Sequence, residues 1–188
     1  MTLLKRYRVP ITFIILVPLL VLSILSGRFP HNPFNINDIQ GIGGTILVLL
    51  GTGLRSWAAG IVHKRKKLTT TGPYAFMRHP LYIGSLLMAL GICSILGDFK
   101  LLFAVLAITF TIYIPKVRTE ERFLSNNFEN EWNDYTLRTG YFFPKGNSFR
   151  IRSEWSISRW TKNKEYYCFW TSLSALALFA MLYTMHLN

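Results

Sequence analysis

A chain of 188 residues has room for about one domain. Of its residues, 51% are hydrophobic and 16% are charged, against roughly a quarter charged in soluble domains, and its mean hydropathy is +0.28. This composition argues against a soluble protein. The net charge is +12, but the placement of the basic residues described below argues against nucleic-acid binding.

Five apolar runs are candidates for membrane-spanning helices, which need about 20 apolar residues and at least roughly 17. They cover residues 9–25, 39–62, 81–97, 101–115 and 166–187. The third and fourth are short enough for buried helices of a soluble protein, but five such runs leave too little amphipathic sequence to enclose them. The first has the basic flank of a signal peptide, yet its length favours a retained helix. The sequence predicts an all-α fold, in which a single domain (1–188) forms a polytopic membrane bundle of about five transmembrane helices.

The basic residues are unequally distributed between the two sides of this bundle. With a cytoplasmic N-terminus, 18 of the 21 Lys and Arg residues fall in cytoplasmic segments, and only Arg28 and Lys100 fall in outside loops. Such a bias sets topology and predicts a multi-pass protein of the plasma or inner membrane, with the C-terminus outside. The excess of basic residues on the cytoplasmic side is then expected to contact anionic lipid head groups.

The connections carry most of the polar sequence. Residues 97–100 join the third and fourth runs into an antiparallel hairpin, and Pro115 is expected to end the fourth. A single amphipathic helix is expected next, with Glu120 and Glu121 in its first turn, where carboxylates suit the helix dipole. Its apolar stripe consists of Leu124, Phe128, Trp132 and Tyr135. The mixed basic and aromatic stretch of 151–167 is typical of a segment in the head-group layer.

Arg55 lies inside the second run. A charge at membrane depth is costly and usually faces a polar cavity or a partner. Alternatively, Arg55 is near the cytoplasmic end of its helix, seven residues from Val62, and its side chain extends to the head groups. The sequence leaves both interpretations open.

Residues 69–84, TTTGPYAFMRHPLYIG, introduce the third run. Pro80 is tolerated in the first turn of a helix, so Arg78 and His79 lie beside a helix N-terminus, whose free N–H groups favour an anion. In the alternative interpretation, both residues are interfacial anchors and Pro80 merely starts the helix.

Glu120 and Glu121 are the only adjacent acid pair in a strongly basic face. They could be ordinary surface partners of Arg118 and Arg122, which would contribute little. The predicted hairpin, however, brings His79 and Glu120 to the same membrane level, where a cation and a carboxylate together would hold the two ends of an amino acid. No metal site is expected, because the histidines are scattered and no cysteine lies near them.

At this point the sequence resembles a known family. RHPLYIG (78–84), the acidic pair and FENEWNDY (128–135) resemble the isoprenylcysteine carboxyl methyltransferases, which are grouped with phospholipid methyltransferases. The resemblance extends to GLRSWAAG (53–60) and RTGYFFP (138–144). It covers roughly residues 50–145 and leaves 146–188 as a basic interfacial segment with a C-terminal transmembrane helix.

The resemblance implies S-adenosyl-L-methionine as cofactor, in a cytoplasmic pocket formed by loops and the amphipathic helix. The backbone of Lys67, Leu68 and Thr69 would line it and Tyr74 would pack on it. The pocket would be completed by the motif residues Arg78, His79, Pro80, Leu81, Tyr82 and Gly84. Glu120 would hold the amino group of the cofactor.

The resemblance also implies a lipid-like or prenylated acceptor in the bilayer, methylated on a carboxylate. Where the prenylcysteine enzymes carry an arginine for that carboxylate, this chain has Lys116, with Arg118 close by, and this departure leaves the acceptor open. A carboxylate is ionised near neutral pH and needs no general base. An amine would need one, and Glu121 or His79 is available.

Two other functions compete with methyl transfer. Membrane sterol and steroid reductases share an RHPxYxG-like motif and use NADPH, but this chain is shorter, and its acidic pair differs from theirs. In a non-enzymatic membrane protein, His79 and Glu120 would be inert anchors. Binding of S-adenosylhomocysteine without binding of NADPH discriminates the methyltransferase from both.

Overall fold

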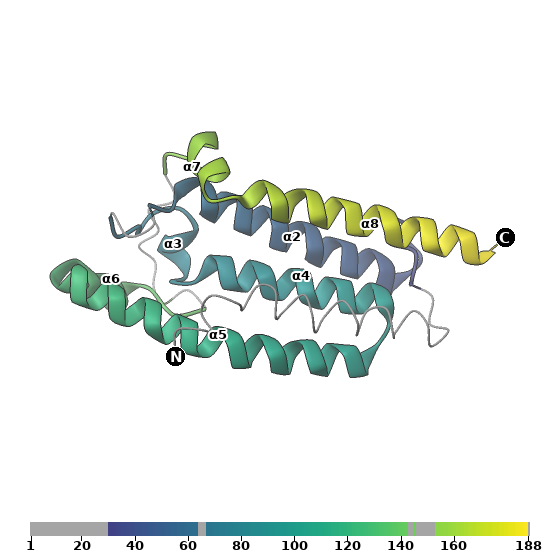
Figure 1. Cartoon of the computed structure of the whole chain (residues 1–188), viewed down its shortest axis with the longest axis horizontal. Helices are drawn as coiled ribbons and strands as arrows, with labels where there is room; N and C mark the ends of the chain where they lie inside the picture. Colours follow the sequence, from purple (N-terminus) through teal and green to yellow (C-terminus); the bar gives the residue numbers. More distant parts are fainter. Residues whose placement is uncertain (1–29, 64–66, 143–144, 146–152, 188) are drawn as a thin grey trace.

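The computed structural model describes residues 30–63, 67–142, 145 and 153–187. Apart from an isolated bridge between Met77 and Gly140, these residues form helices joined by turns, which confirms the all-α prediction (Figure 1). The first predicted run, 9–25, lies outside the described residues. The helices are α2 (Ile39–Ile61), α3 (Pro73–Phe76), α4 (Pro80–Leu96), α5 (Phe99–Asn127), α6 (Glu129–Arg138), α7 (Ile157–Lys162) and α8 (Glu165–Leu187).

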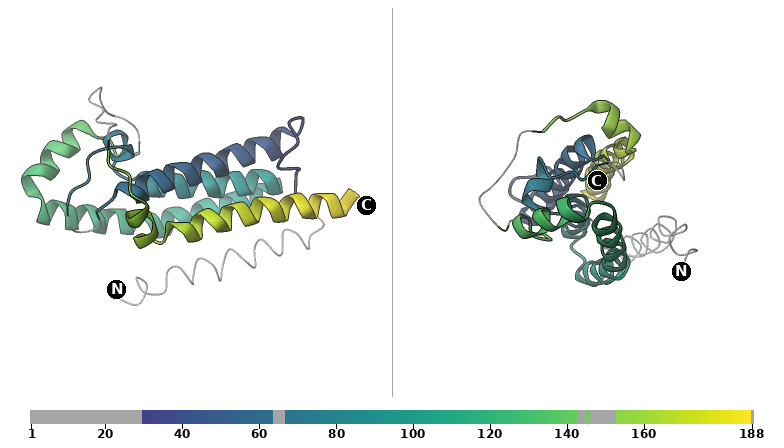
Figure 2. Two further views of the ribbon diagram at one scale, coloured as in Figure 1. Left: turned by 90° about the horizontal axis from the view of Figure 1, so that it is seen from above. Right: turned by 90° about the vertical axis from the view of Figure 1, so that its left-hand side faces the viewer.

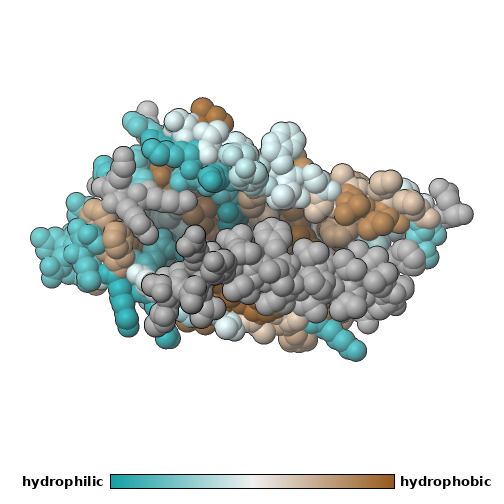
Figure 3. All heavy atoms as spheres, viewed as in Figure 1, coloured by the Kyte–Doolittle hydropathy of each residue, from teal (hydrophilic) through white to brown (hydrophobic). Residues whose placement is uncertain are grey.

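Three of these helices, α2, α5 and α8, are long and apolar enough to cross a membrane, and α4 is a shorter apolar helix. They correspond to the last four predicted runs. The long helices lie side by side along the molecule, and α6 lies at the end opposite to the C-terminus (Figure 2). The side chains are polar at the end that holds α3, α6 and α7 and apolar over the outer part of α8 (Figure 3). We call the first of these the polar end.

Glycines bring α2 and α4 into close contact. Gly44 and Gly51 on α2 lie against Gly91 and Gly84 on α4, and a Cβ at Gly44 would lie 2.6 Å from the carbonyl oxygen of Gly91. The four glycines are spaced seven residues apart on each helix, so they share one face. Small residues of this kind let helix backbones approach in membranes, where lipid removes most of the hydrophobic drive for association.

The end of the bundle away from the polar end is closed by caps and by an apolar core. Gly97 takes the left-handed conformation that ends α4, with φ 61°, and the Asp98 side chain accepts hydrogen bonds from the backbone N–H groups of Lys100 and Leu101 at the start of α5. Side chains of four helices pack together nearby, namely Val48, Cys93, Ile95, Leu96, Leu101, Val105, Leu176 and Phe179. The predicted α4–α5 hairpin is therefore confirmed.

The prediction that Pro115 ends the fourth helix was wrong, because α5 continues through Pro115 to Asn127. Proline removes a single backbone donor and leaves the Thr111 carbonyl, four residues earlier, without its helical partner, a loss that membrane helices tolerate. The hydroxyls of Thr111 and Thr119, on either side of Pro115, donate to the carbonyl oxygens of Ala107 and Pro115, at 2.7 and 2.8 Å. Glu120 and Glu121 consequently lie inside a long helix rather than in a first turn.

The predicted single amphipathic helix is in fact the end of α5 followed by α6. The chain bends at Phe128, whose backbone conformation (φ −136°, ψ 42°) is not helical. The predicted apolar stripe still packs as one cluster, since Leu124, Phe128, Trp132 and Tyr135 surround the buried Leu68. The bend turns α6 back over the segment that precedes α3, and Tyr135 fixes it by donating a hydrogen bond to the Tyr74 carbonyl at 2.7 Å.

Residues 153–163 dock on the C-terminal end of α2. Trp155 Nε1 donates to the Ser56 carbonyl at 3.0 Å, Arg159 Nε to the Gly60 carbonyl at 2.8 Å, and Asn163 Nδ2 to the Ala59 carbonyl at 2.7 Å. The last carbonyls of a helix have no partner within it. The Arg159 and Asn163 side chains therefore provide a C-terminal cap for α2 from about 100 residues further along the chain.

Candidate active site

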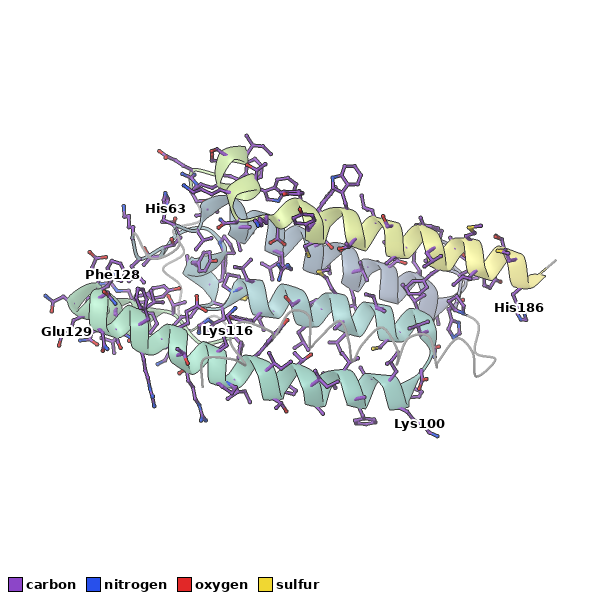
Figure 4. The ribbon with its side chains drawn as sticks, in the orientation of Figure 1. His63, Lys100, Lys116, Phe128, Glu129 and His186 are labelled. Atoms are coloured by element: carbon purple, nitrogen blue, oxygen red, sulfur yellow. The ribbon has the colours of Figure 1, made fainter. Side chains whose placement is uncertain are left out.

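Three chain segments meet at the polar end: the link between α3 and α4, the middle of α5, and the residues after α6. His63, Lys116, Phe128 and Glu129 lie toward this end, whereas Lys100 and His186 lie at the other (Figure 4). The α4–α5 hairpin places the start of α4 beside the middle of α5. Of the residues predicted to bind the cofactor, Arg78 and His79 lie in the link and Glu120 lies on α5, while Pro80, Leu81, Tyr82 and Gly84 follow in the first turns of α4.

Glu121 is the centre of a partly buried polar cluster, which we call the Glu121 cluster and which contains Arg78, His79, Glu121 and Tyr141. His79 Nε2 lies 3.2 Å from Glu121 Oε1, and Arg78 Nη1 lies 3.3 Å from the same oxygen. The Tyr141 hydroxyl donates to the other carboxylate oxygen. The side chains of Arg78, His79 and Glu121 are 10%, 3% and 13% exposed, so these polar groups are largely shielded from water.

The residues after α6 complete this cluster. The Arg78 N–H donates to the Gly140 carbonyl at 3.0 Å, which holds the two segments together. The Arg78 guanidinium carbon lies 3.8 Å from the centre of the Tyr141 ring, a cation–π contact. The sequence indicated RTGYFFP as a motif but did not single out Tyr141. The sequence signal that could have identified Tyr141 is an aromatic residue directly after a glycine, at the end of a polar helix.

Glu120 occupies the neighbouring position on α5 and is exposed. It accepts a hydrogen bond from the Tyr82 hydroxyl at 3.0 Å. The Tyr82 ring packs edge-on against Tyr113, with centroids 4.9 Å apart, and Lys116 Nζ lies 5.1 Å from the Tyr82 ring centre. The predicted residues Tyr82, Lys116 and Glu120 are therefore neighbours. Arg118 lies on α5 and is exposed.

Burial governs the protonation of His79. Burial lowers the pKa of the imidazole from its ordinary value of 6.5, and Arg78 lowers this pKa further. The hydrogen bond to Glu121 and the charges of both glutamates act in the opposite direction. The imidazole is therefore neutral at pH 7, and the cation of the Glu121 cluster is Arg78. The hydrogen bond to Glu121 raises the pKa of Tyr141, so this hydroxyl remains a donor.

The other predicted cofactor residues form the surroundings of the cluster. Lys67 is exposed, Leu68 is buried against Trp132 and Tyr135, and the Thr69 hydroxyl accepts a hydrogen bond from the His63 N–H at 3.3 Å. Tyr74 and Pro80 are buried, and Leu81 is half-buried. Gly84 faces α2 instead, where a Cβ would lie 2.5 Å from Arg55 Cγ. Among the described residues there is no group of three His, Cys, Asp or Glu side chains that could hold a metal ion.

Arg55 has a protein partner within the bundle. Its guanidinium forms a two-pronged ion pair with Glu165 on α8, with Nε–Oε1 and Nη2–Oε2 distances of 2.7 and 3.0 Å. Of the two interpretations that the sequence allowed, the partnered charge is thus the observed one. The sequence alone could not identify Glu165 as the partner, because it lies 110 residues away along the chain.

Comparisons with known proteins show which sequences the chain is similar to. The family model for phospholipid methyltransferase matches residues 39–131, from α2 into α6. The cobalt-zinc-cadmium resistance protein CzcN of Cupriavidus metallidurans is 35% identical over 154 residues, which are 80% of this chain and 68% of that protein. The nickel-cobalt-cadmium resistance protein NccN of Alcaligenes xylosoxydans is 32% identical, over 82% of this chain and 72% of its own length.

A eukaryotic enzyme is more distantly similar. The protein-S-isoprenylcysteine O-methyltransferase of Schizosaccharomyces pombe is 34% identical over 62% of this chain and 55% of its own length. No solved structure matches the chain. The chain belongs to the family of integral-membrane methyltransferases that includes the phospholipid and isoprenylcysteine carboxyl methyltransferases. The chain is therefore a membrane methyltransferase.

Proposed function

We propose that this protein transfers the methyl group of S-adenosyl-L-methionine to a carboxylate of a lipid-like or membrane-embedded acceptor, at the cytoplasmic side of the membrane. The observation that carries the proposal lies at the polar end of the bundle, where Arg78 and His79 contact Glu121 and Tyr82 contacts the adjacent Glu120. The family supports methyl transfer, and the side chains support the choice of donor.

The residues present fit the amino-acid part of this donor. Three donors already engage Glu121, whereas Glu120 is exposed and accepts one bond from Tyr82, so Glu120 is the carboxylate suited to an ammonium group. Arg78 Nε is buried and has no hydrogen-bond partner among the described residues, so its guanidinium is suited to a ligand carboxylate. Glu120 and Arg78 would thus hold the two charged ends, and Tyr82 and His79 would lie between them.

The chemistry asked of the protein itself is modest. When bound, the sulfonium of the cofactor supplies an already electrophilic methyl group. The protein must bind and align the reactants and exclude water, which can contribute several kcal/mol through effective concentration. Lys116 sits on α5 beside the Tyr82 ring, where its charge would hold an acceptor carboxylate. Such a carboxylate is ionised at neutral pH, so no residue of the cluster has to remove a proton.

The proposal is tested by methyl transfer from S-adenosylmethionine labelled in the methyl group, using the full chain in nanodiscs and a total lipid and membrane-protein extract. We expect label in a product that is sensitive to base, because methyl esters hydrolyse in base. Label in a base-stable product would overturn the carboxylate acceptor and indicate an amine. No incorporation, together with NADPH binding, would overturn the methyl donor as well.

A further inference from the structure

The ion pair between Arg55 and Glu165 joins two membrane-spanning helices inside the bundle. The side chains are 21% and 5% exposed, and two parallel hydrogen bonds of 2.7 and 3.0 Å connect them. This two-pronged geometry is the strongest arrangement of a guanidinium and a carboxylate. Charges inside a membrane bundle are expensive to bury, and an apolar contact would hold two helices together as well or better. The pair therefore calls for a role beyond holding α8 to α2.

The remaining guanidinium nitrogen of Arg55, which does not contact Glu165, indicates such a role. Its Nη1 donates to the Leu81 carbonyl at 3.2 Å and to the Ser85 hydroxyl, and Ser85 also donates to the Leu81 carbonyl at 2.9 Å. Leu81 lies between Pro80 and Tyr82, in the first turn of α4. Arg55 thus reaches from the ion pair directly to the turn that carries His79 and Tyr82.

Gly84 makes this reach possible. A Cβ at Gly84 would lie 2.5 Å from Arg55 Cγ and 2.7 Å from the Gly51 carbonyl oxygen, so the stem of Arg55 passes through the space that a side chain would fill. The last glycine of RHPLYIG is thereby explained by the path of Arg55. Lysine has one point of charge and cannot make the same four contacts.

We propose that Glu165, acting through Arg55, positions the first turn of α4, so that α8 is part of the active-site architecture although it lies outside the family-model match. This inference rests on the proposed function for its catalytic meaning. Arg55 and Glu165 are positioning residues: Glu165 fixes the guanidinium, the guanidinium holds the Leu81 carbonyl and Ser85, and that turn presents His79 and Tyr82 to the acidic pair.

The first test needs no cofactor. Amide hydrogen exchange of the full chain in nanodiscs is compared between wild type, Glu165→Gln and the control Glu154→Gln, an exposed carboxylate in the same C-terminal segment. We expect Glu165→Gln to accelerate exchange of residues 79–87 about tenfold and to leave residues 88–96 of the same helix unchanged. Equal exchange of 79–87 in wild type and Glu165→Gln would overturn the proposal, and so would acceleration spread evenly over α4.

The second test asks whether the turn matters for binding. We expect Glu165→Gln and Arg55→Lys each to raise the dissociation constant of S-adenosylhomocysteine about tenfold, Glu165→Asp to recover part of the loss, and Glu154→Gln to bind as wild type does. If Glu165→Gln is not monodisperse, Ser85→Ala is the variant that tests the proposal, because it removes one Arg55 contact without leaving a buried charge unpaired. It should accelerate exchange of 79–87 by a smaller factor, and an unchanged rate overturns the proposal.

The two proposals fail in different ways. Accelerated exchange of 79–87 in a chain whose wild type does not bind S-adenosylhomocysteine would refute the proposed donor and uphold the positioning role. Normal binding by wild type and by Glu165→Gln, with unchanged exchange, would uphold the donor and refute the positioning role.

Discussion

At the scale of single residues, His79 contacts Glu121 and not Glu120. The sequence placed His79 and the acidic pair at one membrane level, and the hairpin confirms that placement. It could not choose between two adjacent carboxylates, because neighbours on a helix point about 100° apart and the rotation of α5 about its axis is set by packing. Tyr141 was missed for a related reason, since its role depends on how the residues after α6 return to Arg78.

The lowered pKa of His79 makes stability depend on pH. Its pKa in the folded protein lies below 6.5, so as the pH falls the unfolded chain takes up the proton first. The contribution to stability is present above about pH 6.5 and is lost as the pH falls toward the folded pKa. We expect the Tm in detergent to drop between pH 7.5 and 5.5, and to drop less in His79→Gln. The same pH dependence in both proteins would show that Glu120 and Glu121 offset the effects of burial and of Arg78 on the pKa of His79.

At the scale of helices, the lengths of the apolar runs predicted α2, α4, α5 and α8. Local signals predicted where some of these helices begin, whereas tertiary packing determines where α5 ends. The starts of α5 and α8 fall within two residues of their predicted positions, because Asp98 and the change of polarity near Glu165 are local signals. The passage of α5 through Pro115 and its bend at Phe128 were not predictable in this way. The bend depends on the cluster around Leu68, whose members are brought together only by the fold.

The glycine contact between α2 and α4 gives a matched pair of substitutions. Gly44→Ala would place a methyl 2.6 Å from the Gly91 carbonyl oxygen, whereas Gly43→Ala meets nothing within 4 Å. We expect Gly44→Ala to destabilise by about 1–3 kcal/mol, as overpacked sites do. Gly43→Ala should be neutral or stabilising by up to about 1 kcal/mol. Thermal unfolding in detergent measures both, and equal effects would contradict this account of the interface.

At the scale of the whole molecule, the polar end contains the candidate site, the acidic pair and the C-terminal cap of α2. Composition and charge asymmetry were sufficient to predict a membrane bundle with one functional face. They gave no indication that residues 153–163 cap α2 or that Glu165 pairs with Arg55, because both contacts join segments about 100 residues apart. Long-range polar pairing has no local sequence signature, so it emerges only from the structure.

The charge asymmetry also predicts an orientation. Glu129 and Lys100 are exposed at opposite ends of the bundle (Figure 4), and the excess of Lys and Arg lies on the Glu129 side. A membrane-impermeant thiol reagent should label Lys100→Cys in intact cells and Glu129→Cys only after permeabilisation. The wild-type chain, with Cys93 buried and Cys168 half-buried, serves as the control. The reverse pattern would place the candidate site outside the cell.

The most direct measurement is isothermal titration of S-adenosylhomocysteine into the full chain in nanodiscs. We predict saturable binding by wild type and by Glu129→Gln, an exposed carboxylate at the same end. Binding should be lost in Glu120→Gln and His79→Ala although their Tm values show that they remain folded, and NADPH should not bind to any of the four. Wild-type affinity in both Glu120→Gln and His79→Ala would contradict the assignment of the site.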